Sequence, residues 1–261
     1  MPTPHEVYQR YITTHLSYIY RGDVKEYEQY RRYFRANYQR FLPADRHASI
    51  VDVGCGLGHC LYYLQSEGYT QFVALDVCAE ALEECIARGL VPRERAVQAE
   101  AGEYLEAHPH TFDVIIMNDV IEHITKEAVL PLLTSVRRAL RPGGVAIIKT
   151  LNASQPLLGC GSRYIDFTHT LLFTEESLRY VCVKAGFAQT AIYPQNIWVF
   201  NPVVNVIGRM GHWMLGGLFR LLFVLYGRHS THIFTKDIIA VARTTHGGST
   251  MQSGHSAHQT G

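Results

Sequence analysis

The first stretch of this sequence that could do chemistry is VDVGCGLGHC, residues 51–60. In it an apolar run carries an acid, Asp52, and leads directly into glycines at alternate positions, Gly54, Gly56 and Gly58. Glycine accepts positive φ and has no Cβ, so a ligand can lie directly against such a backbone. The helix expected next directs its unpaired N–H groups into the same space. The stretch therefore predicts a strand, a binding loop and a helix that together hold a nucleotide-like cofactor.

A second stretch, FDVIIMNDVIEHI, carries groups that could move a proton. Its apolar run, residues 112–117, predicts a central parallel strand, and the run stops at four polar residues, Asn118, Asp119, Glu122 and His123. Histidine titrates near neutral pH and can act as a general base toward a hydroxyl. His123 is the first candidate for this base and His169, on a later loop, is the second. We assign Asp119 to the same catalytic centre.

An acid also stands at the end of the predicted strand over residues 71–77. In a doubly wound sheet this position, Asp76, faces the ligand crevice, where a carboxylate can accept two hydrogen bonds from a ribose diol. The separation between Gly56 and Asp76 is usual for a nucleoside-binding βαβ unit. A buried acid without a partner costs free energy, which disfavours a purely structural role. Val77 is placed beside Asp76 in the cofactor site.

The order of the predicted elements indicates an α/β fold. Strands and helices alternate between residues 50 and 150, with a turn at RPGG, residues 141–144, and a helix beginning at Pro131. Further strands are expected over residues 187–193 and 235–243. We therefore expect one domain over residues 48–244, preceded by a tyrosine-rich helical cap over residues 1–47 and followed by a disordered tail over residues 245–261. Within the cap, residues 8–20 are a candidate lid over the cofactor.

These motifs, followed by AEAGEYL and ALRPGGVAIIKTLN, resemble class I S-adenosylmethionine (SAM) dependent methyltransferases over residues 50–152. The resemblance implies a Rossmann-like, doubly wound, seven-stranded sheet in the order 3-2-1-4-5-7-6, with a helical insertion, residues 196–234, before the last strand. It implies that Glu100 accepts from the adenine amino group while the amide of Ala101 reaches a ring nitrogen. The implied SAM-binding set is Asp52, Gly54, Gly56, Gly58, Asp76, Val77, Glu100, Ala101 and Asn118.

Two narrower resemblances concern the reaction. The segment DFTH, residues 166–169, resembles the D-x-x-H segment of bacterial methyltransferases that act on polysaccharides, lipid-linked sugars and quinones. This implies O-methylation of a hydroxyl on a glycan, a lipid-linked sugar or a quinone-like lipid. The spacing D-x-x-E-H resembles the E-x-x-E-H set of ubiquinone-biosynthesis and small-RNA 2′-O-methyltransferases, and it implies a divalent metal held by Asp119, Glu122, His123 and His169. The first acid here is Asp rather than Glu, which shortens one arm of that set.

Other functions stay open at this point. One is a small-molecule natural-product methyltransferase in which the insertion is a pocket wall, and another is a non-catalytic SAM-binding subunit. An NAD oxidoreductase is least favoured, because a dinucleotide loop reads G-x-G-x-x-G and this chain has His59 at the third glycine position.

The composition of the chain limits which binding partners and which cellular compartment are expected. Lys and Arg number 24 against 23 Asp and Glu, so no basic field attracts nucleic acid. The six cysteines show no C-x-x-C pair and no zinc spacing, which indicates free thiols in the cytoplasm. The apolar residues 202–226 carry a polar stripe of Arg209, His212, Gly216 and Arg220. They could pack on the core or on a second subunit of a homodimer, lie at the inner membrane face, or enclose a lipid substrate.

Overall fold

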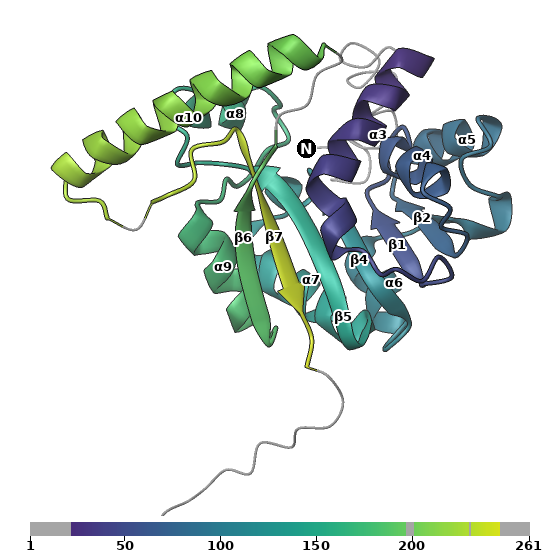
Figure 1. The fold of residues 1–261 in the computed structure, drawn as a ribbon. Helices are drawn as coiled ribbons and strands as arrows, with labels where there is room; N and C mark the ends of the chain where they lie inside the picture. Colours follow the sequence, from purple (N-terminus) through teal and green to yellow (C-terminus); the bar gives the residue numbers. More distant parts are fainter. Residues whose placement is uncertain (1–21, 197–200, 230, 246–261) are drawn as a thin grey trace, which may run out of the picture.

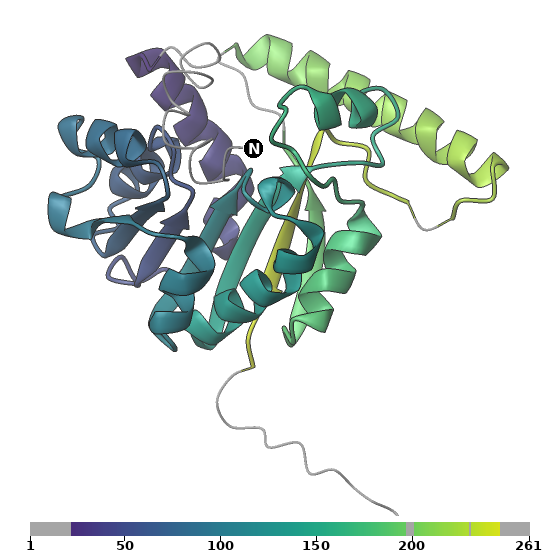
Figure 2. The same cartoon turned by 180° about the vertical axis from the view of Figure 1, so that it is seen from behind.

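The computed structural model describes residues 22–196, 201–229 and 231–245 (Figure 1). Most of the predicted tail, the candidate lid over residues 8–20 and the first part of the predicted cap lie outside the described residues. In the described part, a twisted sheet is covered by helices on both faces, and one long helix, α10, lies beyond the end of the sheet (Figures 1 and 2).

Within the described residues, seven strands form one sheet in the order β3-β2-β1-β4-β5-β7-β6. The first five strands are mutually parallel, and β7 runs antiparallel between β5 and β6. The predicted fold class and strand order are therefore confirmed. The strands are β1 (Ile50–Val53), β2 (Phe72–Asp76), β3 (Ala96–Gln98), β4 (Phe112–Asn118), β5 (Leu140–Leu151), β6 (Gln189–Pro194) and β7 (Asp237–Arg243).

Alternating side chains of the central strands build a core on each face of the sheet. On β4, Ile115 and Met117 pack toward α6, α7 and α9, whereas Val114 and Ile116 pack toward α3, α4 and α5. Figure 2 shows the face covered by α6, α7 and α9. The helices are α3 (Val24–Tyr38), η2 (Gln39–Phe41), α4 (His59–Ser66), α5 (Ala79–Ala87), η3 (Arg93–Arg95), α6 (Ala101–Ala107), η4 (Ile121–His123), α7 (Lys126–Ala139), α8 (Gly159–Tyr164), α9 (Glu175–Lys184) and α10 (Pro202–Leu225).

Two predicted boundaries are wrong. The RPGG segment is not a turn before the fifth strand, because residues 141–144 lie inside β5. Phe112 pairs with Leu140 and Val114 with Val145, so a step of two residues on β4 faces a step of five on β5. The extra residues form a bulge, which bends the strand locally instead of turning the chain before it. Helix α7 begins at Lys126 rather than at Pro131, which it contains in its second turn.

The predicted insertion helix is present as α10, but it packs little on the rest of the protein. Among its described side chains only Asn205 is buried. Phe219 and Phe223 contact Phe234, just before β7, with ring centroids 5.8 and 5.1 Å apart. Packing of a broad apolar face on the core, one of the open alternatives, is therefore not what the structure shows. None of the described helices combines the length and apolar character needed to cross a membrane.

A glycine substitution tests how tightly the loop before α4 is constrained. Gly58 has φ of 77°, and a Cβ there would lie 2.6 Å from Leu90 Cδ1 and 2.8 Å from Cys85 Sγ, both buried. We expect Gly58→Ala to lower the free energy of unfolding by about 2 to 4 kcal/mol in urea titrations, because backbone strain and overpacking add. Gly68→Ala is the control. Gly68 also has positive φ, at 85°, but a Cβ added there would meet no neighbouring atom within 4 Å. This variant should lose only about 1 kcal/mol, and equal losses in the two variants would contradict this account of the loop.

Candidate functional site

The glycine loop and the acid after it form one unit at the carboxyl edge of the sheet. Gly54, Gly56 and Gly58 all have positive φ, at 69°, 50° and 77°. The Gly56 N–H donates to Asp76 Oδ2 at 2.9 Å, and the Cys78 N–H donates to Asp76 Oδ1 at 2.9 Å. A carboxylate offers about four acceptor positions, so Asp76 keeps capacity for ligand hydroxyls. The structure thus places the predicted ribose acid against the predicted cofactor loop.

Asp52 is a buried acid that lacks an ordinary hydrogen-bond partner. Strand alternation puts it on the same face of β1 as Ile50, the face covered by α4. Apart from the Cys60 thiol, neither carboxylate oxygen has a hydrogen-bond partner among the described residues. Burial and the charge of Asp76 raise the pKa of Asp52 to about 8, although the Cys60 thiol acts in the opposite direction. A cationic group of a ligand near the loop would be a matching partner for this carboxyl group.

Glu100 has a structural task that the sequence did not indicate. Its side chain caps α6 by accepting from the Glu103 N–H at 2.9 Å. A Cβ on Gly102 would lie 3.0 Å from Glu100 Oε2, so a larger residue there would crowd the capping side chain. Ala101 is the first residue of α6, so its N–H has no acceptor within the helix. Both residues lie beyond the end of β3, on the same edge as Asp76.

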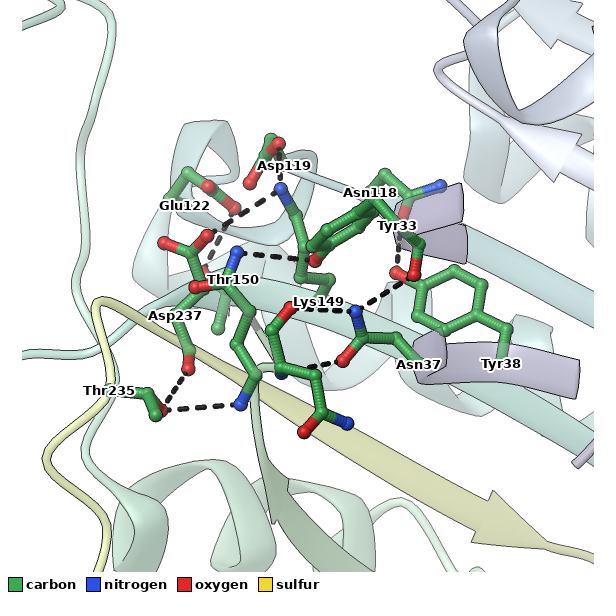
Figure 3. Close-up of polar contacts among 12 residues, drawn as sticks. Tyr33, Asn37, Tyr38, Asn118, Asp119, Glu122, Lys149, Thr150, Thr235 and Asp237 are labelled. Carbon is green, nitrogen blue, oxygen red and sulfur yellow. Dashed lines mark hydrogen bonds and ion pairs between the residues drawn. The ribbon is translucent and has the colours of Figure 1, made fainter. Parts of the chain in front are cut away.

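At the carboxyl end of β4, a largely buried lysine replaces the expected metal-like arrangement around Asp119. Lys149, near the end of β5, forms an ion pair with Asp119 and lies 3.9 Å from Asp237 at the start of β7 (Figure 3). Asp119 has φ of 53°, a left-handed conformation that is uncommon outside glycine. Burial alone would lower the pKa of Lys149, but Asp119, Tyr33 and Asp237 hold it well above its usual value. Lys149 therefore stays charged between two carboxylates.

Helix α3 covers this edge with tyrosines. Tyr27 donates its hydroxyl to the carbonyl of Leu57 in the glycine loop at 2.6 Å, and Tyr38 donates to Asn118 Oδ1. The Tyr33 ring centroid lies 6.0 Å from Lys149 Nζ (Figure 3). The predicted tyrosine-rich cap therefore contacts both predicted functional stretches, although sequence periodicity alone did not say which residues it would meet.

Glu122 is turned into the protein rather than toward a ligand. It is fully buried, its Oε2 accepts from the Thr150 hydroxyl at 3.0 Å, and its Oε1 has no hydrogen-bond partner among the described residues. Burial and the nearby Asp119 raise the pKa of Glu122 well above its usual value. A metal ligand must be deprotonated, so this upward shift in pKa makes Glu122 a weaker metal ligand.

His123 belongs to a different polar cluster, in which the hydrogen bonds fix its tautomer. The Thr168 hydroxyl donates to Asp166 Oδ1 at 2.6 Å and lies 2.8 Å from His123 Nδ1. Because the single hydroxyl hydrogen goes to the carboxylate, Nδ1 must be the donor and Nε2 carries the lone pair. Burial and the neighbouring His169 lower the pKa of His123 to about 4. His123 is therefore a neutral base at physiological pH, with Nε2 as its basic atom.

His169 completes this cluster. Its ring centroid lies 4.8 Å from that of His123, and its Nδ1 donates to the carbonyl of Ser162 in α8 at 2.8 Å. Nitrogen and oxygen atoms of His123, Asp166 and His169 lie within 4.8 Å of one another, a spacing at which they could hold a metal ion. The structure thus brings His123 and His169 together with Asp166, while Asp119 and Glu122 are engaged with Lys149 and Thr150.

The sequence matches a family model described as a methyltransferase domain over residues 27–192. A ubiquinone biosynthesis O-methyltransferase of Vibrio cholerae serotype O1 is 31% identical over 105 residues, which are 40% of this chain and 42% of that protein. A malonyl-[acyl-carrier protein] O-methyltransferase of Enterobacter lignolyticus is 35% identical over 129 residues, 48% of each chain. The chain therefore matches less than half the length of these curated relatives.

Solved structures show the same fold at low identity. A SAM-dependent methyltransferase from Archaeoglobus fulgidus has a TM-score of 0.58 at 19% identity, covering 82% of this chain and 94% of that one. The phosphoethanolamine N-methyltransferase 2 of Haemonchus contortus, crystallised with SAM, has a TM-score of 0.57 at 17% identity, covering 91% of this chain and 60% of that one.

Removing the buried lysine tests the charge arrangement at this edge. Lys149→Met leaves Asp119 and Asp237 without their shared cation. We therefore expect the free energy of unfolding at pH 7 to fall by about 2 to 4 kcal/mol. This range already allows for solvent screening at Asp119, which is partly exposed. Loss of the cation raises the folded-state pKa of Asp237 further above its unfolded value. The deficit should therefore shrink as the pH is lowered from 7 toward 5.

Arg93→Met serves as the control for this experiment, because Arg93 forms an exposed ion pair with Glu83. Urea titrations of both variants should show no measurable loss for Arg93→Met. A Lys149→Met protein as stable as the wild type, or one whose deficit grows on acidification, would contradict the assigned charges.

Proposed function

This chain belongs to the family of methyltransferase domains and is a class I SAM-dependent methyltransferase, and we propose that it methylates a hydroxyl oxygen of a glycan, a lipid-linked sugar or a quinone-like lipid. The observation that carries the proposal is His123, a neutral imidazole oriented by Thr168 and Asp166 beyond the carboxyl end of β4. Both curated relatives named above are O-methyltransferases, which supports oxygen as the methyl acceptor.

The residues at the sheet edge fit SAM as the cofactor, which supplies an activated methyl group. We assign the ribose hydroxyls to Asp76 and the methionine ammonium to Asp52, a buried carboxyl group that has only the Cys60 thiol as a partner in the described part of the chain. The adenine is assigned to Glu100 and Ala101, and Val77 and Asn118 flank the same site. Backbone N–H groups of the glycine loop and of α4 complete the cradle.

His123 is assigned as the general base. As the acceptor oxygen forms its bond to the methyl carbon, the carbon–sulfur bond breaks and the hydroxyl proton passes to His123 Nε2. An oxygen that gains a methyl group becomes far more acidic than an imidazolium, so a base with a pKa of about 4 is strong enough to take this proton. The resulting positive charge is stabilised by Asp166 through the Thr168 hydroxyl. His169 and Asp119 are positioning candidates in this scheme.

A divalent metal is the second candidate for activating the hydroxyl. His123, Asp166 and His169 would hold it, because the Nδ1 atoms of both histidines are used for other hydrogen bonds and their Nε2 atoms carry the lone pairs. Such a cation would lower the pKa of a bound hydroxyl. The predicted ligands Asp119 and Glu122 do not join this group. We favour the metal-free scheme, because Asp166 is already engaged by Thr168. Its Oδ1 accepts one hydrogen bond from the Thr168 hydroxyl and another from the Thr168 N–H.

Transfer from SAM with an isotopically labelled methyl group tests the proposed function. The protein is incubated with a simple sugar, a lipid-linked sugar and a quinone-like phenol, and the labelled product is identified by mass spectrometry. We expect an O-methyl product, and we expect His123→Gln to lower kcat at least about 100-fold with an unchanged dissociation constant for SAM. His108→Gln is the matched control, since His108 lies at the end of α6 and its imidazole contacts Tyr104 of the same helix.

Two results would overturn parts of this scheme. Exclusive N- or C-methylation would exclude the hydroxyl acceptor, and a His123→Gln enzyme as fast as wild type would exclude the base. The same assay after treatment with a chelator decides the role of a metal. We expect full activity after chelation, whereas a loss restored by Mg²⁺, Mn²⁺ or Zn²⁺ would transfer the role of His123 to metal binding.

A further inference from the structure

A broad apolar surface lies next to the candidate site. It consists of the outer face of α10 together with exposed residues in and around α8, and we call it the apolar platform. Helix α8 lies beside α10 in both views (Figures 1 and 2). Its exposed large side chains include Leu157, Leu158, Tyr164, Ile165 and Phe167 around α8, and Val203, Val206, Ile207, Met210, Trp213, Met214, Leu218, Leu221, Leu225 and Tyr226 on and after α10. An apolar surface this extensive is unusual on a protein that meets only water.

The segment that contains α10 carries charges of one sign. No Asp or Glu occurs between Glu176 and Asp237, whereas that segment contains Arg179, Lys184, Arg209, Arg220, Arg228 and Lys236. On α10, Arg209 and Arg220 are separated by about three helical turns and therefore share one margin of the apolar face. Long cationic side chains at such a margin can reach out to an anionic surface while the apolar face is buried.

The platform is joined directly to the proposed base. Phe167 is fully exposed, and its chain neighbours Asp166 and Thr168 make the hydrogen bonds that orient His123. Ser162 of α8 accepts from His169. Asn152, at the end of β5, donates to the carbonyls of Ile233 and Thr235 at 2.9 and 3.0 Å, which fixes the segment that Phe219 and Phe223 of α10 contact.

We propose that the apolar platform docks on an anionic membrane surface, with α10 lying flat in the interface and the carboxyl edge of the sheet near the lipid headgroups. This inference goes beyond the proposed methyl transfer and does not depend on which acceptor is used. Trp213 and Tyr226, which are 81% and 86% exposed, suit the headgroup region, and no described helix could cross the membrane. A second copy fits less well, because a symmetric contact through this face would bring arginines together without acids to pair them.

Vesicle sedimentation tests the proposal with the full chain. We expect binding to phosphatidylcholine vesicles that contain phosphatidylglycerol, weaker binding at high salt, and little binding to pure phosphatidylcholine. Val206→Glu should lower the partition coefficient about tenfold, because it puts a carboxylate on the apolar face. Val183→Glu on α9 is the matched control, since the two valines are 57% and 55% exposed, and it should bind like the wild type.

A fluorescence measurement supports the sedimentation result. In a Trp198→Phe protein, the emission of Trp213 should shift to shorter wavelength when anionic vesicles are added. Absence of vesicle binding by the wild type, or equal binding by Val206→Glu and Val183→Glu, would overturn the proposal. A stable dimer that Val206→Glu dissociates, with no vesicle binding, would assign the platform to a second copy. Methyl transfer to a water-soluble acceptor is measured separately, so failure of docking and failure of catalysis are distinguishable.

Discussion

The hydrogen bond from the Gly56 N–H to the Asp76 carboxylate is the interaction on which the proposed cofactor edge of this protein depends. Parallel strands end at the same edge of a sheet, so the loop after β1 and the acid that ends β2 are brought together by topology. Glycine lets the loop take positive φ, and the carboxylate then holds one of its N–H groups. The topology of the sheet also brings charged groups together beside this loop. There Lys149 on β5 is held by Asp119 after β4 and by Asp237 at the start of β7.

The fold, and the placement of the glycine loop and Asp76 at one edge of the sheet, could be predicted from the sequence because their signals are local. An apolar run followed by glycines, and an acid after the next apolar run, each fix a strand end without reference to the rest of the chain. The lysine site could not be predicted in this way. Lys149 follows the apolar residues Ile147 and Ile148, and this was the one available signal, because a lysine near the end of a buried strand needs an acid. Which acids would meet it depends on the antiparallel placement of β7.

The predictions for the catalytic edge show the same limit. The sequence grouped Asp119, Glu122, His123 and His169 by a motif, but the left-handed conformation of Asp119 and the buried position of Glu122 separate two of them from the histidines. Asp166 and Thr168, which orient His123, belong to a loop that is distant from His123 in sequence. RPGG is a common turn sequence, but here it lies inside β5 and forms a bulge where β5 pairs with β4. Roles that depend on long-range pairing were therefore the ones that sequence reasoning missed.

The central claim is that His123 is a neutral base that needs no deprotonation before methyl transfer. The most direct test is the single-turnover rate of methyl transfer at saturating SAM, measured between about pH 4 and pH 8. Since burial and His169 lower the pKa of His123 to about 4, the rate should stay constant as the pH falls from 8 to about 5. A rate that falls by half near the ordinary histidine pKa of about 6.5 would contradict the account.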